Sequence, residues 1–170
     1  MLSWTHVEHL RADWRGHMTE QIPDPDPDTM TAFNADVKAF NANVVDEFRA
    51  NGGKVGGPFA DIELLLLTTT GAKTGRPRVS PLAYLRVDGE LIIVGSYRGA
   101  DVHPAWVHNL LVNPRAHVEL GPQSFDVTAR ELPPGERDAV WAKLLARAPV
   151  FGEYQAKTSR VIPLFELNRL

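Results

Sequence analysis

The sequence of 170 residues contains no cysteine. This absence excludes disulfide bonds, thiolate nucleophiles and zinc sites with cysteine ligands. Long apolar runs are also missing, because strictly aliphatic stretches such as Leu64 to Leu67 are far too short to cross a bilayer. The first 20 residues lack the basic and apolar regions of a signal peptide. We therefore expect a cytoplasmic protein without membrane contact.

An excess of positive charge is absent as well, since the formal net charge is -3. The protein as a whole has no electrostatic reason to bind nucleic acid or an anionic membrane. Any attraction for anions must therefore be local. The composition, 44% hydrophobic and 23% charged, is that of a globular chain long enough for one domain with a sizeable core.

The N-terminal third predicts helices. Residues 1–20 have helical spacing of apolar side chains, and the alternating prolines and aspartates of residues 22–28 predict an extended connector. Residues 29–50 predict a second helix that ends at the glycines after Asn51. Its apolar stripe consists of Phe33, Val37, Phe40, Val44 and Phe48. We expect residues 1–50 to form an N-terminal helical extension and residues 51–170 the main domain.

The main domain predicts six short strands interrupted by helices. The predicted strands are residues 62–70, 77–87, 91–96, 116–121, 123–132 and 160–169; the predicted helices are 103–114, 133–149 and 150–159. Tight turns between neighbouring strands favour antiparallel pairing over a doubly wound parallel sheet. The predicted fold class is α+β, with six antiparallel strands closed into a small barrel and helices over its openings.

A basic, glycine-bearing loop follows the first predicted strand, within TTTGAKTGRPRVSPLAYL (residues 68–85). Exposed backbone N–H groups and nearby positive side chains suit a phosphate or a carboxylate. The residues in question are Gly71, Lys73, Thr74, Gly75, Arg76 and Arg78. The spacing matches neither a Walker loop nor a Rossmann fingerprint. A solvated hairpin loop that is basic by chance is the alternative.

A second glycine-bearing turn follows the third predicted strand, in VGSYRGADVHP. Ser96 lies at the strand end, and Arg98 and Gly99 precede a helix. Such a turn can present backbone donors to a polar ring or a phosphate, although an ordinary connection has the same sequence features. Two such turns in consecutive elements favour one anionic ligand that contacts both.

Three stretches together resemble the deazaflavin-dependent nitroreductase family, which includes F420H2-dependent quinone reductases. They are LLLLTTTGAKTGRPRVSPLAYL, IIVGSYRGADVHPAWVHNLLVNPRAHVEL and RVIPLFEL, within residues 52–169. The resemblance implies a split β-barrel of the FMN-binding type and an oxidoreductase that uses coenzyme F420. FMN is the less favoured cofactor, and no metal site is expected.

The resemblance also assigns roles to residues. It implies that Lys73, Thr74, Gly75, Arg76 and Arg78 hold the phosphate and the oligoglutamate tail of F420. It further implies that Ser96, Tyr97, Arg98 and Gly99 line the deazaflavin ring or the tail, and that Trp106 and Asn109 support the pocket. A hydroxyl near the ring, from Ser96 or Tyr154, would donate a hydrogen bond or a proton to the reduced acceptor.

The substrate side departs from members that reduce nitroimidazoles, in which tyrosines line the pocket. Here Ala83 takes the first such position, with Tyr84 beside it, and the late helix keeps Tyr154 but has Phe151 nearby. We expect a more apolar pocket for a small-molecule acceptor. The expected acceptor is a quinone, an enone or a nitroaromatic compound, and a quinone or a hydrophobic enone would fit the pocket better than a nitroimidazole.

Alternatives remain at this point. An FMN-dependent reductase on the same barrel would also need a phosphate site, and a non-catalytic deazaflavin carrier would keep the clamp without turnover. His6 and His9 have helical spacing but no evident third ligand for a metal. Monomer and homodimer are both compatible with the sequence.

Overall fold

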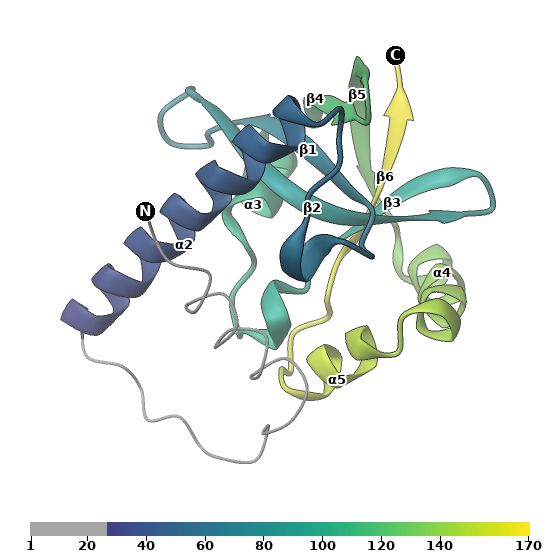
Figure 1. Cartoon of the computed structure of the whole chain (residues 1–170). Coiled ribbons are helices and arrows are strands. Elements are labelled where there is room, and N and C mark those ends of the chain that lie inside the picture. Colours follow the sequence, from purple (N-terminus) through teal and green to yellow (C-terminus); the bar gives the residue numbers. More distant parts are fainter. Residues whose placement is uncertain (1–26) are drawn as a thin grey trace.

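A computed structural model describes the protein from residue 27 to residue 170 (Figure 1), with side chains from residue 38 onward except Pro58. The helix expected over residues 1–20 and most of the expected connector lie outside these residues. The helices are α2 (Pro27–Ala50), α3 (Ala105–Val112), α4 (Pro134–Arg147) and α5 (Val150–Ala156), with short 3-10 turns η1 (Gly57–Phe59) and η2 (Tyr97–Gly99). The strands are β1 (Leu64–Thr70), β2 (Pro77–Val87), β3 (Glu90–Val94), β4 (Arg115–Leu120), β5 (Gln123–Glu131) and β6 (Leu164–Arg169).

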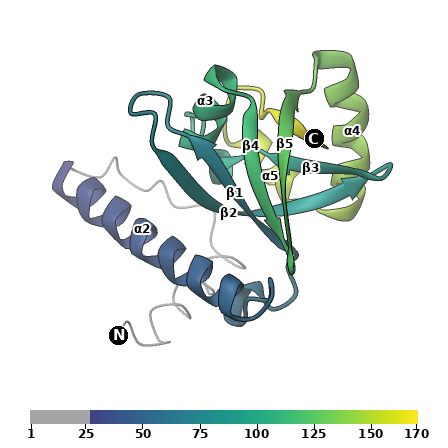
Figure 2. The ribbon, with the colours of Figure 1, turned by 90° about the horizontal axis from the view of Figure 1, so that it is seen from above.

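The six strands close into a barrel in the order β1-β2-β3-β6-β5-β4, and every neighbouring pair is antiparallel. Figure 2 shows this barrel between α2 on one side and α4 on the other. The predicted fold class is confirmed. The first strand starts two residues later than predicted, at Leu64. The two other misplaced ends are those of β3, which stops at Val94, and of β6, which starts only at Leu164. Gly95 and Pro163 lie at these ends, where a glycine weakens a strand and a proline cannot donate to the ladder.

The barrel interior is the main core. Alternate residues of the strands point inward, so Leu65 and Leu67 of β1 meet Ile93 of β3 and Phe165 of β6. Helix α3 closes one end of the barrel with Trp106, Val107 and Leu110, all nearly inaccessible to solvent. The loop between β1 and β2 belongs to this closed end, because Thr70 and Pro77 pair there.

The outer faces carry two satellite cores. Val44, Val45 and Phe48 of α2 pack on Leu64 and Leu66 of β1, which confirms the predicted stripe for its described C-terminal half. Arg49 adds a bidentate ion pair to Glu119 of β4, with nitrogen–oxygen distances of 2.9 and 2.8 Å. Helix α2 is thus held against the barrel, and the division at residue 50 stays a prediction.

Helices α4 and α5 cover another face of the barrel. Leu144 of α4 is fully buried against Val87, Ile92 and Leu164. In the part of the chain that the structure describes, no helix is both long and apolar enough to cross a membrane.

Candidate functional site

The basic loop (residues 71–78) has a defined backbone. The N–H of Gly71 donates to the carbonyl of Arg76, and the N–H of Gly75 donates to the carbonyl of Gly71, both at 2.8 Å. Gly75 adopts a positive φ of 68°, which a residue with a Cβ atom reaches only with strain. A Cβ atom on Gly71 would lie 2.7 Å from Oγ1 of Thr74. The two glycines therefore permit this tight turn.

Asn109 of α3 ties the basic loop to the closed end of the barrel. Its Oδ1 accepts a hydrogen bond from the N–H of Ala72 at 2.9 Å, and its Nδ2 donates to Oγ1 of Thr69 at 3.0 Å. The side chains of Asn109 and Thr69 are both buried. Asn109, predicted to support the pocket, lies where it positions the loop.

The cations of the loop face solvent. Lys73, Arg76 and Arg78 are exposed, and none of their charged side chains forms an ion pair or a hydrogen bond with another described residue. Other basic residues of the barrel do pair, as Arg115 does with Asp126 and Arg130 with Glu166. Three adjacent positive charges without a described counter-charge attract anions.

The second turn (residues 95–100) has an unusual backbone. Tyr97 and Arg98 have positive φ values of 44° and 53°, and Gly99 follows with 81°. Consecutive non-glycine residues with left-handed φ values raise the free energy of the backbone, and such strain is concentrated at functional sites. A Cβ atom on Gly99 would lie 2.6 Å from the carbonyl oxygen of Tyr154, so this turn packs tightly on α5.

Arg160, which the sequence analysis did not single out, lies behind the second turn. Its guanidinium donates to the carbonyl oxygens of Ala100 (2.7 Å), Gly95 (3.0 Å) and Ser96 (2.8 Å). One of its nitrogens, Nη1, also lies 3.0 Å from Nδ1 of His103. A lone arginine before the last strand carries no sequence signal, because its partners are three backbone carbonyls 60 or more residues away and one histidine ring 57 residues away.

Tyr154 lies on α5 beside the second turn and is 9% exposed. Burial raises the pKa of its phenol above the ordinary value, although the positive charge of Arg98 opposes this. The ring meets Phe151 edge to face at 6.0 Å between centroids, and Nζ of Lys157 lies 5.8 Å from its centre. Tyr154 is therefore a protonated donor at neutral pH, next to the positive charges of Arg98 and Lys157.

The two residues expected on the substrate side, directly after Pro81 and Leu82 of β2, lie on opposite faces of the strand. Tyr84 packs against the barrel interior, whereas Ala83 is exposed on the outside. Phe151 packs on the outer surface with Leu85 and Val94. The structure thus brings Phe151 and Tyr154 together but points Tyr84 into the core. Trp106 is likewise a core residue, 5.7 Å from Phe165, and supports the site only through α3.

The two turns are linked through α3. His103, which precedes α3, contacts Arg160, the residue that binds the carbonyls of the second turn. Its ring centroid lies 5.8 Å from that of His108. The next residue on α3, Asn109, holds the basic loop. A chain of contacts thus connects the predicted phosphate site with the predicted ring site.

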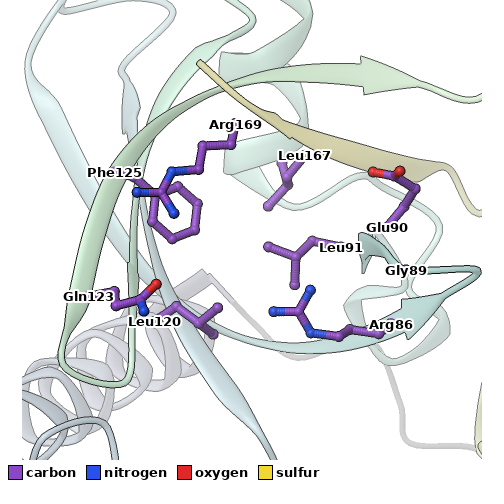
Figure 3. Close-up of a pocket in the computed structure, with 9 residues that line it drawn as sticks. All are labelled: Arg86, Gly89, Glu90, Leu91, Leu120, Gln123, Phe125, Leu167 and Arg169. Carbon is purple, nitrogen blue, oxygen red and sulfur yellow. The ribbon is translucent and has the colours of Figure 1, made fainter.

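A cavity of about 200 Å³ lies at the other end of the barrel, away from both turns. Figure 3 shows Arg86, Glu90 and Arg169 around an apolar floor that includes Leu91 and Leu167. It contains none of the predicted site residues. In the described part of the chain, no three histidine or carboxylate side chains come together in a way that would hold a metal ion.

Comparison of the sequence with known proteins identifies the family that this chain resembles. The sequence model of the F420H(2)-dependent quinone reductase family matches residues 41–168. An F420H(2)-dependent quinone reductase of Mycobacterium tuberculosis is 41% identical over 110 residues, which cover 62% of this chain and 72% of that protein.

Solved structures agree with the fold. An F420-H2 dependent reductase, FDR-A, is 40% identical and superposes with a TM-score of 0.56 over 62% of this chain and 93% of its own. A protein described as a domain-swapped dimer is 34% identical, with a TM-score of 0.59 over 79% of this chain and 99% of its own. HutZ of Vibrio cholerae, at 21% identity and a TM-score of 0.50, shares the fold alone.

Proposed function

The chain belongs to the F420H(2)-dependent quinone reductase family, and on that premise we propose that it transfers a hydride from reduced coenzyme F420 to a quinone. The family match carries the proposal. The three exposed cations of the basic loop support it, because they lack a described counter-charge. The strained backbone of the second turn supports it as well. A cytoplasmic enzyme that works as a monomer or homodimer is part of the proposal.

The residues present fit coenzyme F420, which carries a phosphodiester and an oligoglutamate tail. Lys73, Arg76 and Arg78 would hold these anionic groups, with Thr74 and Gly75 shaping the loop between them. The second turn would receive the deazaflavin ring, through Ser96, Tyr97, Arg98 and Gly99. The N–H groups of Ser96, Tyr97 and Arg98 donate to no described residue, so they are available to such a ligand.

The reduced deazaflavin supplies a hydride, so the protein needs little acid–base chemistry of its own. Its part is to place the acceptor and to stabilise the charge that develops on the acceptor's oxygen. Tyr154 fits the donor role, because its phenol stays protonated and lies beside the second turn. Ser96, whose hydroxyl forms no hydrogen bond with a described residue, is the second candidate.

The acceptor is proposed from the apolar side chains near Tyr154. Phe151 stacks edge to face on the tyrosine, and Ala83 leaves the outer face of β2 without a bulky group. These surfaces suit a hydrophobic quinone or enone better than a polar nitroaromatic compound. Tyr84 contributes from within the barrel, behind Ala83, and shapes the wall of the site indirectly.

Parallel titrations with oxidised F420 and with FMN, followed by fluorescence, test the proposal. We expect tight binding of F420 and no binding of FMN, followed by oxidation of F420H2 when a menadione-like quinone is added. Binding of FMN alone would assign the barrel to a flavin enzyme. Binding of F420 without oxidation by any acceptor would indicate a carrier.

A further inference from the structure

Arg160 fixes the direction of two peptide groups in the second turn. The carbonyl oxygens of Gly95 and Ser96 both point at its guanidinium, at 3.0 and 2.8 Å. In a trans peptide the N–H points opposite to the C=O, and the described residues contain no cis peptide. The N–H groups of Ser96 and Tyr97, which belong to these two peptides, therefore point away from Arg160.

These two N–H groups have no acceptor among the described residues. The turn that presents them is strained at Tyr97 and Arg98, which both have the left-handed φ values that L residues rarely adopt. A strained turn persists only where its surroundings determine it fully. Here the surroundings are Arg160, which binds three carbonyls of the turn at once, and the tight contact of Gly99 with α5.

We propose that Arg160 is a positioning residue that holds the N–H groups of Ser96 and Tyr97 outward as a pair of donors for the bound cofactor. The inference rests on the proposed function, since the deazaflavin is taken as the acceptor of these hydrogen bonds. Arg160 acts through the backbone of the turn, from the side opposite to the donors.

His103 makes this arrangement sensitive to pH. Its Nδ1 can accept a hydrogen bond from Arg160 only while that nitrogen carries no proton. The groups that face His103 are Arg160, His108 and Glu131. Burial first, then Arg160 and His108, lower the pKa of the His103 imidazole, and Glu131 opposes them. Asp101 is the carboxylate that acts on Arg160. Protonation of His103 places a second positive charge 3.0 Å from Arg160 and loosens its hold on the turn.

Substitution of Arg160 by lysine tests the positioning role. Lysine keeps the charge but cannot reach four acceptors with one nitrogen, so the Kd for F420 should rise by at least about tenfold. The matched control is Arg130→Lys, which alters an ion pair with Glu136 and Glu166 outside both turns and should leave that Kd unchanged. An unchanged Kd in a folded Arg160→Lys protein overturns the proposal.

The pH dependence is tested with His103→Asn, whose amide oxygen accepts a hydrogen bond from Arg160 without titrating. The ratio of the Kd values for F420 at about pH 5 and about pH 7.5 should be at least about threefold larger in the parent protein than in the variant. Titration of the ligand's own groups is common to both proteins and cancels. Equal ratios would remove His103 from the mechanism.

A third measurement needs no cofactor. In the ligand-free protein, the amide NMR signals of residues 96–100 should shift or broaden in Arg160→Lys and stay in place in Arg130→Lys. If the parent protein fails to bind F420, the proposed function fails, and these signals still decide whether Arg160 determines the turn. Unchanged signals overturn the positioning role whatever the cofactor is.

Discussion

The basic loop and the second turn offer two different ways to hold an anionic ligand. The basic loop has relaxed glycine turns and presents charged side chains, which face solvent without a described counter-charge. The second turn has a strained backbone and presents N–H groups, which an internal arginine holds in place. Flexible side-chain charges attract from a distance and are screened by salt, whereas fixed backbone donors select by geometry.

The largest effect should come from Gly99→Ala. The new Cβ atom would lie 2.6 Å from the carbonyl oxygen of Tyr154, at a residue with a φ of 81°. We expect the free energy of unfolding to fall by about 2–4 kcal/mol and F420 binding to be lost. Gly75→Ala is the control, with a φ of 68° but nothing within 4 Å of the new atom, and should cost about 1 kcal/mol. Equal melting temperatures for the two variants would contradict the distinction.

Removal of the loop cations should affect binding and leave stability unchanged. Lys73→Ala and Arg78→Ala should each raise the Kd for F420 by about tenfold or more, because a charge-assisted hydrogen bond contributes about 1.5–3 kcal/mol. Added salt should weaken binding of the parent protein more than that of the variants. Arg86→Ala, which removes an exposed charge at the opposite end of the barrel, is the control. The clamp is excluded if isothermal titration shows the parent affinity in all three.

Tyr154→Phe separates chemistry from binding. If the phenol donates to the reduced acceptor, kcat should fall by roughly tenfold or more, while the Kd for F420 changes little. Because burial raises the pKa of Tyr154, the parent rate should show no loss from its ionisation below about pH 10. Equal steady-state rates for parent and Tyr154→Phe would remove this hydroxyl from catalysis.

The smallest effect should come from removing the charge of Glu119 on β4, which lies outside both turns. The Arg49 guanidinium lowers the pKa of the Glu119 carboxyl, so this ion pair stabilises the folded protein above the ordinary pKa of glutamate. The stabilisation is lost as the pH falls through the depressed value. Glu119→Gln should reduce the free energy of unfolding by at most about 1 kcal/mol at neutral pH, and the two proteins should converge in acid. Urea denaturation at both pH values measures this, and a difference that grows in acid would refute it.

The fold was accessible from sequence because its signals are local. Tight turns and apolar runs located all six strands, and the apolar stripe of α2 follows helical spacing through Phe40, Val44 and Phe48. The order in which β6 enters between β3 and β5 depends on contacts across the chain, which local sequence signals do not contain.

The candidate site was accessible only in part. Runs of Gly, Lys and Arg revealed the basic loop, since charge and glycine content are properties of the residues themselves. Arg160 was missed because its role depends on carbonyl groups, which every residue has. Tyr84 was placed beside Ala83 in the sequence, but the two-residue period of a strand turns it into the barrel.

Helix α3, which closes one end of the barrel, contains a natural fluorophore. Trp106 is buried in α3, and its indole packs edge to face on Phe165. In the sequence it lies between His103, which contacts Arg160, and Asn109, which binds the basic loop. Replacing Trp4, Trp14 and Trp141 by phenylalanine would leave Trp106 as the single tryptophan in the chain. Its fluorescence would then register a ligand arriving at either turn, and each step of binding could be timed without attaching a dye.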